Sequence, residues 1–265
     1  MIVDLEPRIG NGQRFRNPRP VSHGGDQIIV YQRGSFLDHR EKLIALTADF
    51  MSQELGWSNE NALKTMQKGL SLPSNTVQID ESLIPSVMVF DRNGEVIGVS
   101  AQRLIHLDTA IGSVPFLQHL LRAFIPDYRG QGRGTFSVQE AQIIHPQAEF
   151  YGHRTQSAAA IQANRHSGIF LPGRYFPIDA LYSTDSVMQE VMAAYYVKAR
   201  ANKTGWVDGR TGVSKDDFPQ PNESYLPPEP EEQHPDTWLM FMRMQKVWKM
   251  RFPSRDVLHG VGQLK

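Results

Sequence analysis

Apolar and polar residues along the first third of the chain follow the spacings of strands and helices in turn. Residues 27–32 (QIIVYQ) have the β-branched and aromatic content of a strand. In residues 35–55 the apolar side chains recur at helical spacing, and Gly56 supplies a stop for the predicted helix. A second, shorter helix is predicted over residues 58–69, with Ser58 as its cap.

The middle of the chain predicts a β-hairpin and then a long strand. Residues 86–90 (SVMVF) and 95–102 (EVIGVSAQ) are strand-like runs on either side of Asn93 and Gly94. An Asn-Gly pair between two such runs is the strongest short signal for a hairpin turn. A further strand-like run, residues 114–125 (VPFLQHLLRAFI), leads into a glycine-rich segment.

Strands and helices continue to alternate in the second half of the chain. Pro146 ends one predicted helix, and Gly168 ends another ahead of an apolar run. The predicted elements are a helix over residues 135–145, a strand over 148–153, and helices over 157–166 and 184–201. This interleaving favours an α/β sheet over an all-helical fold.

The two ends of the chain differ in composition from the part between them. Residues 1–25 are rich in Gly, Pro, Arg and Asn, bury little surface and predict a flexible arm. Residues 202–235 are rich in Pro and acidic side chains and predict an extended linker or surface wrap. Residues 236–265 predict a helix and a tail, and the Trp and Met side chains of this helix pack either on their own domain or in a homodimer contact.

Composition narrows the classes of partner. Lys and Arg number 28 and match 28 Asp and Glu, so no overall field attracts nucleic acid or an anionic membrane. The chain has no Cys, which excludes thiolate chemistry, and its nine His residues show no standard ligand spacing, so no metal is expected. Neither a signal-peptide core nor a long apolar span is present, which predicts a cytoplasmic protein without membrane contact.

The glycine-rich segment Arg-Gly-Gln-Gly-Arg-Gly, residues 129–134, lies between a predicted strand and a predicted helix. Free backbone N–H groups of such a loop and of the first helical turn converge on one point and can bind a phosphate. Glycine permits the close approach, and Arg129 and Arg133 could add charge-assisted contacts. The spacing fits neither a P-loop, which needs a Gly-Lys-Ser/Thr ending, nor the G-x-G-x-x-G dinucleotide fingerprint. A mere tight turn between strand and helix is the alternative.

Residues 125–134 (IPDYRGQGRG) resemble the pyrophosphate-binding motif R/Q-x-x-G-x-G/A of the GNAT (GCN5-related N-acetyltransferase) superfamily, with matches at Arg129, Gly132 and Gly134. Residues 157–170 (SAAAIQANRHSGIF) more loosely resemble the family's helix that ends in Gly-Phe. The resemblance covers residues 26–182 and implies one domain there, with residues 183–201 as an additional helix. The implied fold is α/β: a mixed, mostly antiparallel central sheet flanked by helices and splayed at the cofactor cleft, with a C-terminal helical extension.

The resemblance also implies a co-substrate, acetyl-CoA or another acyl-CoA. The loop amides would meet the pyrophosphate, and the pantetheine arm would pair with the edge of the strand over residues 114–125. The implied coenzyme contacts are Phe124, Ile125, Arg129, Gly130, Gln131, Gly132, Arg133, Gly134, Thr135 and Asn164.

Catalytic groups follow less directly from the resemblance. The family often draws its base from the strand before the loop, where His119 has an unperturbed pKa near working pH. Strand alternation places Gln118 and Arg122 on the opposite face, and a one-residue shift of register would exchange the candidates. Where the family has its acid Tyr this chain has Asn164, an amide that cannot act as an acid, so either Tyr175 or water takes the role.

Taken together, these residues predict an acyl-CoA-dependent N-acyltransferase with acetyl as the default donor. The acceptor would be an amine of a small molecule, a peptide or a protein. Because Asn164 departs from the family pattern, the alternative is a non-catalytic acyl-CoA sensor or scaffold with the same fold.

Overall fold

A central sheet of ten strands organises the part of the chain described by the computed structural model, residues 17–72, 83–155, 158–176, 186–200, 207–208, 213–214 and 257–265. In chain order the elements are β1 (Arg19–His23), β2 (Asp26–Tyr31), α1 (Arg33–Leu55), α2 (Asn59–Gly69), β3 (Ser86–Arg92), β4 (Glu95–Thr109), β5 (Gly112–Phe124), the 3₁₀ turn η2 (Pro126–Tyr128), α3 (Arg133–Ile144), β6 (Phe150–Thr155), α4 (Ala158–Arg165), β7 (Phe170–Phe176), α5 (Ser186–Arg200), β8 (Val207–Asp208), β9 (Val213–Ser214) and β10 (Val257–Leu264).

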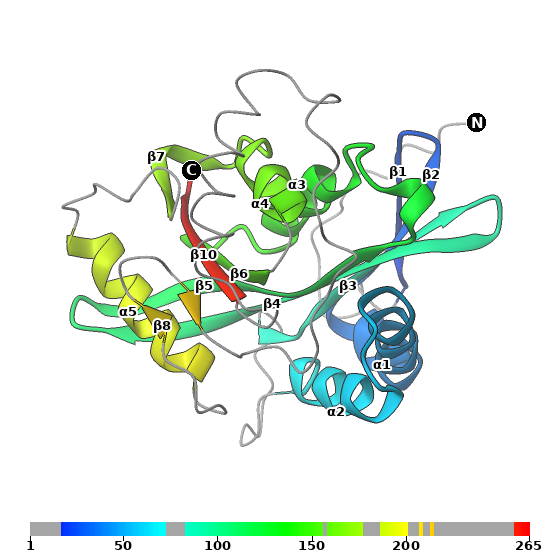
Figure 1. The fold of residues 1–265 in the computed structure, drawn as a ribbon, viewed down its shortest axis with the longest axis horizontal. Coiled ribbons are helices and arrows are strands. Elements are labelled where there is room, and N and C mark those ends of the chain that lie inside the picture. The colour runs from blue at the N-terminus through cyan, green and yellow to red at the C-terminus, as the bar shows by residue number, and fades with distance from the viewer. Residues whose placement is uncertain are drawn as a thin grey trace.

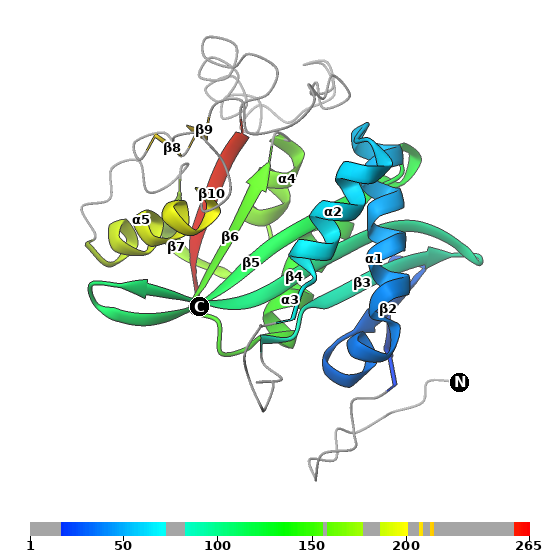
Figure 2. The ribbon, with the colours of Figure 1, turned by 90° about the horizontal axis from the view of Figure 1, so that it is seen from below.

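The strand order is β1-β2-β3-β4-β5-β6-β10-β9-β8, and β7 pairs with β10 beside this path. Helices cover both faces: α3 and α4 lie on one, while α1, α2 and α5 lie on the other (Figure 1; Figure 2). All of the described strand pairs are antiparallel except β5 with β6. The predicted fold class, a mixed and mostly antiparallel sheet flanked by helices, is therefore confirmed.

The first predicted elements form as their patterns indicate. Helix α1 ends at Gly56, whose φ of 66° is the left-handed conformation that glycine adopts without steric cost. The hairpin of β3 and β4 turns at Asn93 and Gly94, with φ of 57° and 85°, as a two-residue turn of this kind requires. Local sequence signals thus decide this half of the sheet.

A bulge interrupts the ladder between β4 and β5. Ala101 pairs with Leu121, but the next residue, Gln102, pairs with His119, so Leu120 has no opposite residue. Such an insertion bends the strand and turns the following side chains to the other face. The bulge therefore resets the alternation in the strand that leads to the glycine-rich segment.

Strands β5 and β6 run side by side for a short distance and then separate. They pair in parallel at three positions, from Phe116 with Phe150 to Gln118 with Gly152. Beyond these pairs the strands diverge, as Figure 2 shows. The resulting gap in the ladder, here called the splay, has His119–Phe124 on one wall and His153–Thr155 on the other.

Two strands depart from the sequence prediction. Residues 19–23, predicted as part of a flexible arm, form β1 against β2. Residues 257–264, predicted as part of a helix and tail, form β10, which pairs with β6, β7 and β9. The partners of β10 lie far away in the chain, so no local pattern reveals this strand. Strand β1, by contrast, is joined to β2 by the two-residue turn Gly24-Gly25, with φ of 57° and 86°, a local hairpin signal that the prediction of an arm overlooked. The predicted helix of residues 236–250 lies outside the described residues.

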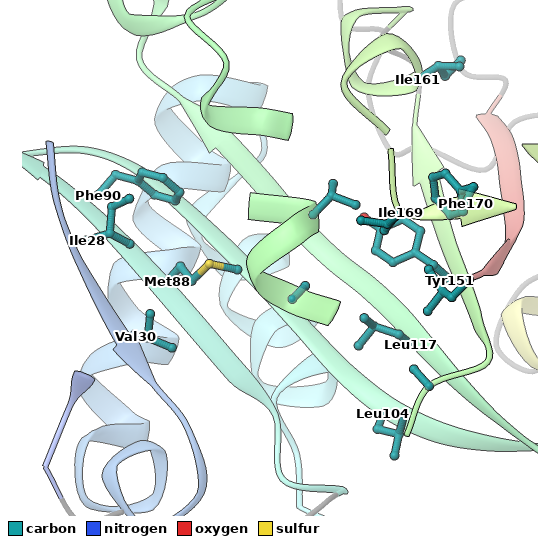
Figure 3. Packing of buried hydrophobic residues seen from close by; sticks show 14 of the residues in the cluster. Ile28, Val30, Met88, Phe90, Leu104, Leu117, Tyr151, Ile161, Ile169 and Phe170 are labelled. Carbon is teal, nitrogen blue, oxygen red and sulfur yellow. The ribbon is translucent and has the colours of Figure 1, made fainter. Parts of the chain in front are cut away.

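Three apolar clusters hold the layers together. The first lies between the sheet and helices α3 and α4, and Figure 3 shows 14 of its residues, among them the labelled Phe90, Leu117 and Tyr151. The second lies between the sheet and helices α1 and α2, and the third beneath α5. Burying a large apolar side chain stabilises a fold by about 1.5–3 kcal/mol. In the described part of the chain no helix is both long and apolar enough to cross a membrane.

Candidate coenzyme and acyl-transfer site

The glycine-rich segment connects β5 to α3. Gly130 and Gly132 have φ of 74° and 78°, a left-handed conformation that any side chain would strain. Gly132 is the N-cap residue of α3, and its carbonyl accepts the N–H of Phe136 at 2.9 Å. The loop and the first helical turn thus present their backbone N–H groups beyond the end of β5, the arrangement that binds a phosphate.

A buried ion pair anchors this loop to the sheet. The Arg133 guanidinium donates to both carboxylate oxygens of Asp26, at 2.5 and 3.0 Å, and to the Tyr128 carbonyl at 2.8 Å. Arg92 also donates to Asp26, at 2.7 Å. Burial alone would raise the pKa of Asp26, but the hydrogen bonds and charges of Arg133 and Arg92 outweigh it and hold that pKa below its usual value.

The structure thus gives both arginines of the loop partners within the chain. Arg133 was predicted as a charge-assisted coenzyme contact, yet its side chain is 3% exposed and faces Asp26. Arg129 donates to the Phe124 carbonyl and to Glu54, at 2.9 and 2.8 Å. Their guanidinium groups shape the loop, so the backbone of the segment is what remains to meet an anion.

The remaining predicted coenzyme contacts lie along the same path. Gln131 donates to the Asp127 carbonyl at 3.2 Å, and Thr135 donates to the Ala163 carbonyl at 3.3 Å. A Cβ at Gly134 would lie 3.1 Å from the Cβ of Ala163, so the start of α3 packs closely on α4. Phe124 and Ile125 form the end of β5, next to the loop.

Three buried polar groups near the start of the splay, from strands β4, β5 and β6, have no hydrogen-bond partner among the described residues. These atoms are Gln102 Nε2, His119 Nε2 and Tyr151 Oη. Gln102 and His119 are opposite each other in the ladder, and the rings of His119 and Tyr151 are 5.9 Å apart. Each unpaired buried group costs the fold about 1–3 kcal/mol unless a ligand or water satisfies it.

Burial determines the protonation of these groups. It lowers the pKa of His119 well below its usual 6.5, and the charges of Arg122 and His153 lower it further. Burial also raises the pKa of Tyr151 to about 12. At neutral pH the imidazole is therefore neutral and the phenol protonated, so Tyr151 and the Gln102 amide are available as donors.

A connected polar network surrounds His153 on the β6 side of the splay. Asn164 Nδ2 lies 3.0 Å from His153 Nδ1 and 3.4 Å from Tyr175 Oη, and Tyr175 Oη lies 3.3 Å from His153 Nε2. The Arg122 guanidinium joins the network by donating to Asn164 Oδ1 at 2.9 Å. The side chains of His153, Asn164 and Tyr175 are buried.

The bulge corrects one sequence prediction. Arg122 was placed on the opposite face from His119 by strand alternation, but both lie on the α3 and α4 face. In the ladder Arg122 pairs with Ser100 and His119 with Gln102, two residues that share a face of β4 and contact each other at 3.5 Å. Gln118 does lie on the opposite face, where it accepts from Arg103 at 2.9 Å.

The site therefore collects His119, Asn164 and Tyr175, together with Arg122, which the sequence named as a residue that a shift of register would bring to this face. Three further members were not predicted: Gln102, Tyr151 and His153. Tyr151 and His153 alternate along a predicted strand, which does indicate a shared face. For Gln102 the sequence gives no signal, because only its pairing with β5 brings it to the site, and the bulge turns Arg122 to the face on which His119 lies.

Comparison with known proteins gives similarity in fold. No family model matches the chain, and no curated protein matches its sequence. A GCN5-related N-acetyltransferase from Anabaena variabilis matches with a TM-score of 0.38 and 15% identity, over 56% of this chain and 33% of that one. The chain thus spans a third of the length of that protein.

Two other solved structures are covered more fully. An aminoglycoside acetyltransferase from an uncultured soil metagenomic sample, in complex with sisomicin, matches with a TM-score of 0.35 and 11% identity, over 54% of this chain and 88% of that one. The microcin C7 self-immunity acetyltransferase MccE, in complex with acetyl-CoA and AMP, matches with a TM-score of 0.33 and 9% identity, over 57% and 81%. All three proteins are acetyltransferases.

Proposed function

We propose that the chain is an acyl-CoA-dependent N-acyltransferase, with acetyl as the default group and an amine as the acceptor. The observation that carries this proposal is the placement of Gln102, His119 and Tyr151, buried groups with unused hydrogen-bonding capacity. They lie beside the bulge of β5, whose far end continues into the glycine-rich segment. One strand therefore links a phosphate-binding loop to a polar reaction site.

The glycine-rich loop and the unpaired edge of β5 fit the coenzyme. Backbone N–H groups of residues 130–135 would bind its pyrophosphate. Gly130 and Gly132 have no side chain that would block the approach of the phosphate. The backbone of β5 from His119 onward is not paired with β6, so this strand edge would accept the amide groups of a pantetheine arm. When bound, the coenzyme supplies an acyl thioester for transfer.

The polar groups beside the bulge have complementary roles in such a transfer. The amine nitrogen attacks the thioester carbonyl, and negative charge develops on the carbonyl oxygen. Tyr151 Oη and Gln102 Nε2 are donors in a buried site, where donors aimed at developing charge have their largest effect. His119 is neutral and accepts the proton that the attacking nitrogen releases; its lowered pKa suits the acidic ammonium formed on attack rather than the free amine.

A second function is favoured by one observation. Arg122 donates to the carbonyls of Gly134 and Ala160, at 3.0 and 3.1 Å, as well as to Asn164, and so ties β5 to both α3 and α4. A site whose elements are tied together in this way suits a non-catalytic acyl-CoA sensor as well as an enzyme. An enzyme and a sensor would both bind acyl-CoA, but only the enzyme would turn it over.

Calorimetry with acetyl-CoA and a coenzyme A release assay over a panel of amines test the proposal. Binding with amine-dependent release is the expected result; binding without release from any amine supports the sensor, and no binding to acetyl-CoA or longer acyl-CoAs overturns both. Gly132→Val should weaken acetyl-CoA binding at least tenfold, because it strains a backbone of φ 78° in the loop. Gly24→Ala is the matched control, since Gly24 also has a positive φ, 57°, but lies outside the loop.

A further inference from the structure

An arginine lies on the face of the sheet opposite to His119, at the point where the splay begins. Arg103 pairs with Gln118 in the ladder of β4 and β5, and Gln118 pairs with Gly152 in the last row that joins β5 to β6. On this face α2 and α5 lie apart, with β5 and β6 visible between them (Figure 2). Arg103 is thus one position along β4 from Gln102, but its side chain lies on the other side of the sheet.

Two hydrogen bonds hold the Arg103 guanidinium. Its Nε donates to Gln118 Oε1 at 2.9 Å, and its Nη1 donates to the Gly69 carbonyl at the end of α2, at 3.5 Å. In the part of the chain that the structure describes, no carboxylate forms an ion pair with Arg103. Since a guanidinium has more N–H donors than these two contacts use, part of its fork is left for a ligand.

The charge of Arg103 is half-buried. Burial lowers the pKa of Arg103, and the charge of Tyr195 on α5 opposes this effect. An arginine nevertheless stays charged at neutral pH. Among the described residues this cation has lost water without gaining a counter-charge, so an anion that binds there would compensate the loss.

A second arginine extends the positive charge to β6. A Cβ at Gly152 would overlap the ring of Phe116 and lie 3.3 Å from that of Tyr195, so Gly152 faces α5. Because side chains alternate along a strand, Arg154 faces the same side as Gly152, while His153 faces the other. Arg154 is also half-buried. Positive groups from β4 and β6 therefore flank the start of the splay on the α5 side.

A purely structural role at the end of α2 is shared with another arginine. Arg40 donates to the Leu70 carbonyl at 3.2 Å, a shorter contact than that of Arg103 with Gly69. Positive side chains stabilise the C-terminal end of a helix when they reach its last carbonyls. Arg40 therefore provides the comparison that separates capping of α2 from binding of a ligand.

We propose that the acceptor of the acyl group is a small amine that also carries a carboxylate, and that Arg103 binds this carboxylate. The proposal rests on the acyl-transfer function proposed above. The planar fork of an arginine matches the two oxygens of a carboxylate. From Arg103 the acceptor would extend through the splay, where no ladder hydrogen bond joins β5 to β6, and bring its amine to the His119 side. Arg154 would add to the attraction of a negatively charged acceptor.

Matched pairs of acceptors test the proposal in the coenzyme A release assay. The ω-amino acids from β-alanine to 6-aminohexanoate are compared with alkylamines in which a methyl group replaces the carboxylate. We expect kcat/KM of at least one ω-amino acid to exceed that of its alkylamine at least tenfold. Arg103→Met should lower this ratio about tenfold or more, as expected for the loss of a charge-assisted hydrogen bond. Arg103→Lys keeps the charge but not the fork and should retain part of the preference.

Two controls separate binding from stability. Arg40→Met is the matched variant, because it removes a donor from the same end of α2, and it should leave the ratio unchanged. Nuclear magnetic resonance of the ¹⁵N-arginine-labelled protein without coenzyme reads the Arg103 Nε signal, which is assigned by its absence from Arg103→Lys. The ω-amino acids should shift this signal and the alkylamines should not.

Equal kcat/KM within every pair, or a preference that survives Arg103→Met, would overturn the proposal. A preference for phosphoethanolamine over every amino acid would also overturn it, because the site would then take a phosphate. If the protein binds no acyl-CoA, the acyl-transfer function fails, and the titration of the Arg103 signal still decides whether this residue binds a carboxylate.

Discussion

The two walls of the splay each present a histidine, and the two histidines differ in their hydrogen bonds although both rings lie near the ring of Tyr151. On β6, His153 has Asn164 at Nδ1 and Tyr175 at Nε2. On β5, His119 Nε2 is buried without a partner among the described residues, and so is the amide nitrogen of Gln102 opposite it. The polar groups around His153, on the β6 wall, are thus hydrogen-bonded to one another, whereas those around His119, on the β5 wall, lack hydrogen-bond partners among the described residues.

This difference indicates how the site divides its work. A satisfied buried network is rigid and specifies one arrangement of its members, which suits groups that must be held at a fixed position. Unsatisfied buried groups lower stability and gain partners only when a ligand arrives, which suits groups that receive the reacting atoms. Under the proposed function, the β6 wall would hold groups in position and the β5 wall would receive the reacting atoms.

Removing the ion pair that anchors the glycine-rich loop should have the largest effect on stability. Asp26→Asn leaves the buried guanidinium of Arg133 without its anionic partner, and breaking a buried pair in this way costs about 3–5 kcal/mol. Urea unfolding measures the loss, with Asp38→Asn at an exposed position as the control. A variant as stable as the wild type would show that the loop does not depend on this pair.

The next prediction concerns a buried histidine outside the splay. Burial, with a smaller contribution from the charge of Arg33, lowers the pKa of His145 to about 4, and its Nε2 lies 3.0 Å from Ser86 Oγ. The unfolded chain therefore binds the proton more tightly, so stability is complete above pH 6.5 and falls as the pH drops toward 4.

In that window His145 should contribute a slope of about 1.4 kcal/mol per pH unit, up to roughly 3 kcal/mol at pH 4. His145→Gln keeps a polar group beside Ser86 and should flatten the pH dependence of the unfolding free energy by that slope. Urea unfolding at several values from pH 7 to pH 4.5 checks it. Equal slopes in the two proteins would mean that His145 is already protonated in the folded state.

How far the sequence predicts this molecule depends on the range of the interactions. Helix α1 with its stop at Gly56 and the turn at Asn93 and Gly94 rest on neighbouring residues, and the sequence predicts them. The bulge at Leu120 and strand β10 rest on pairing with distant segments, so no local pattern contains them. The same limit applies to the site.

His119 was predicted from its place in the strand before the glycine-rich segment, and Tyr175 as a substitute for the tyrosine that Asn164 replaces, but the network that joins Tyr175 to His153 needs the fold. Gly260, which makes room for the imidazole of His153, lies 107 positions further along the chain. The sequence around the glycines of β10 does not indicate their role, because the rings that pack against them come from distant parts of the chain.

Breaking the hydrogen-bond network of the β6 wall should lower the stability less than removing the Asp26–Arg133 ion pair. His153→Leu has a similar volume but leaves Asn164 Nδ2 and Tyr175 Oη without that partner, and each such group costs about 1–3 kcal/mol. We expect a loss near the middle of this range for the pair, since Asn164 still reaches Tyr175. Guanidinium unfolding of the variant and the wild type at pH 7.5 measures it, and an unchanged midpoint would contradict the network.

The same substitution at His119, on the β5 wall, should change the stability in the opposite direction. His119→Leu removes a buried nitrogen that has no partner and replaces it by an apolar group, which is neutral or stabilising by up to about 1 kcal/mol. If the proposed function holds, turnover should nevertheless fall, because the variant has lost the group proposed to accept the proton, while acetyl-CoA affinity stays within threefold. A stability gain with lost activity is the signature of a group kept for function rather than for folding. If His119→Leu instead destabilises the chain as much as His153→Leu does, the two walls do not differ in the way that their hydrogen bonds indicate.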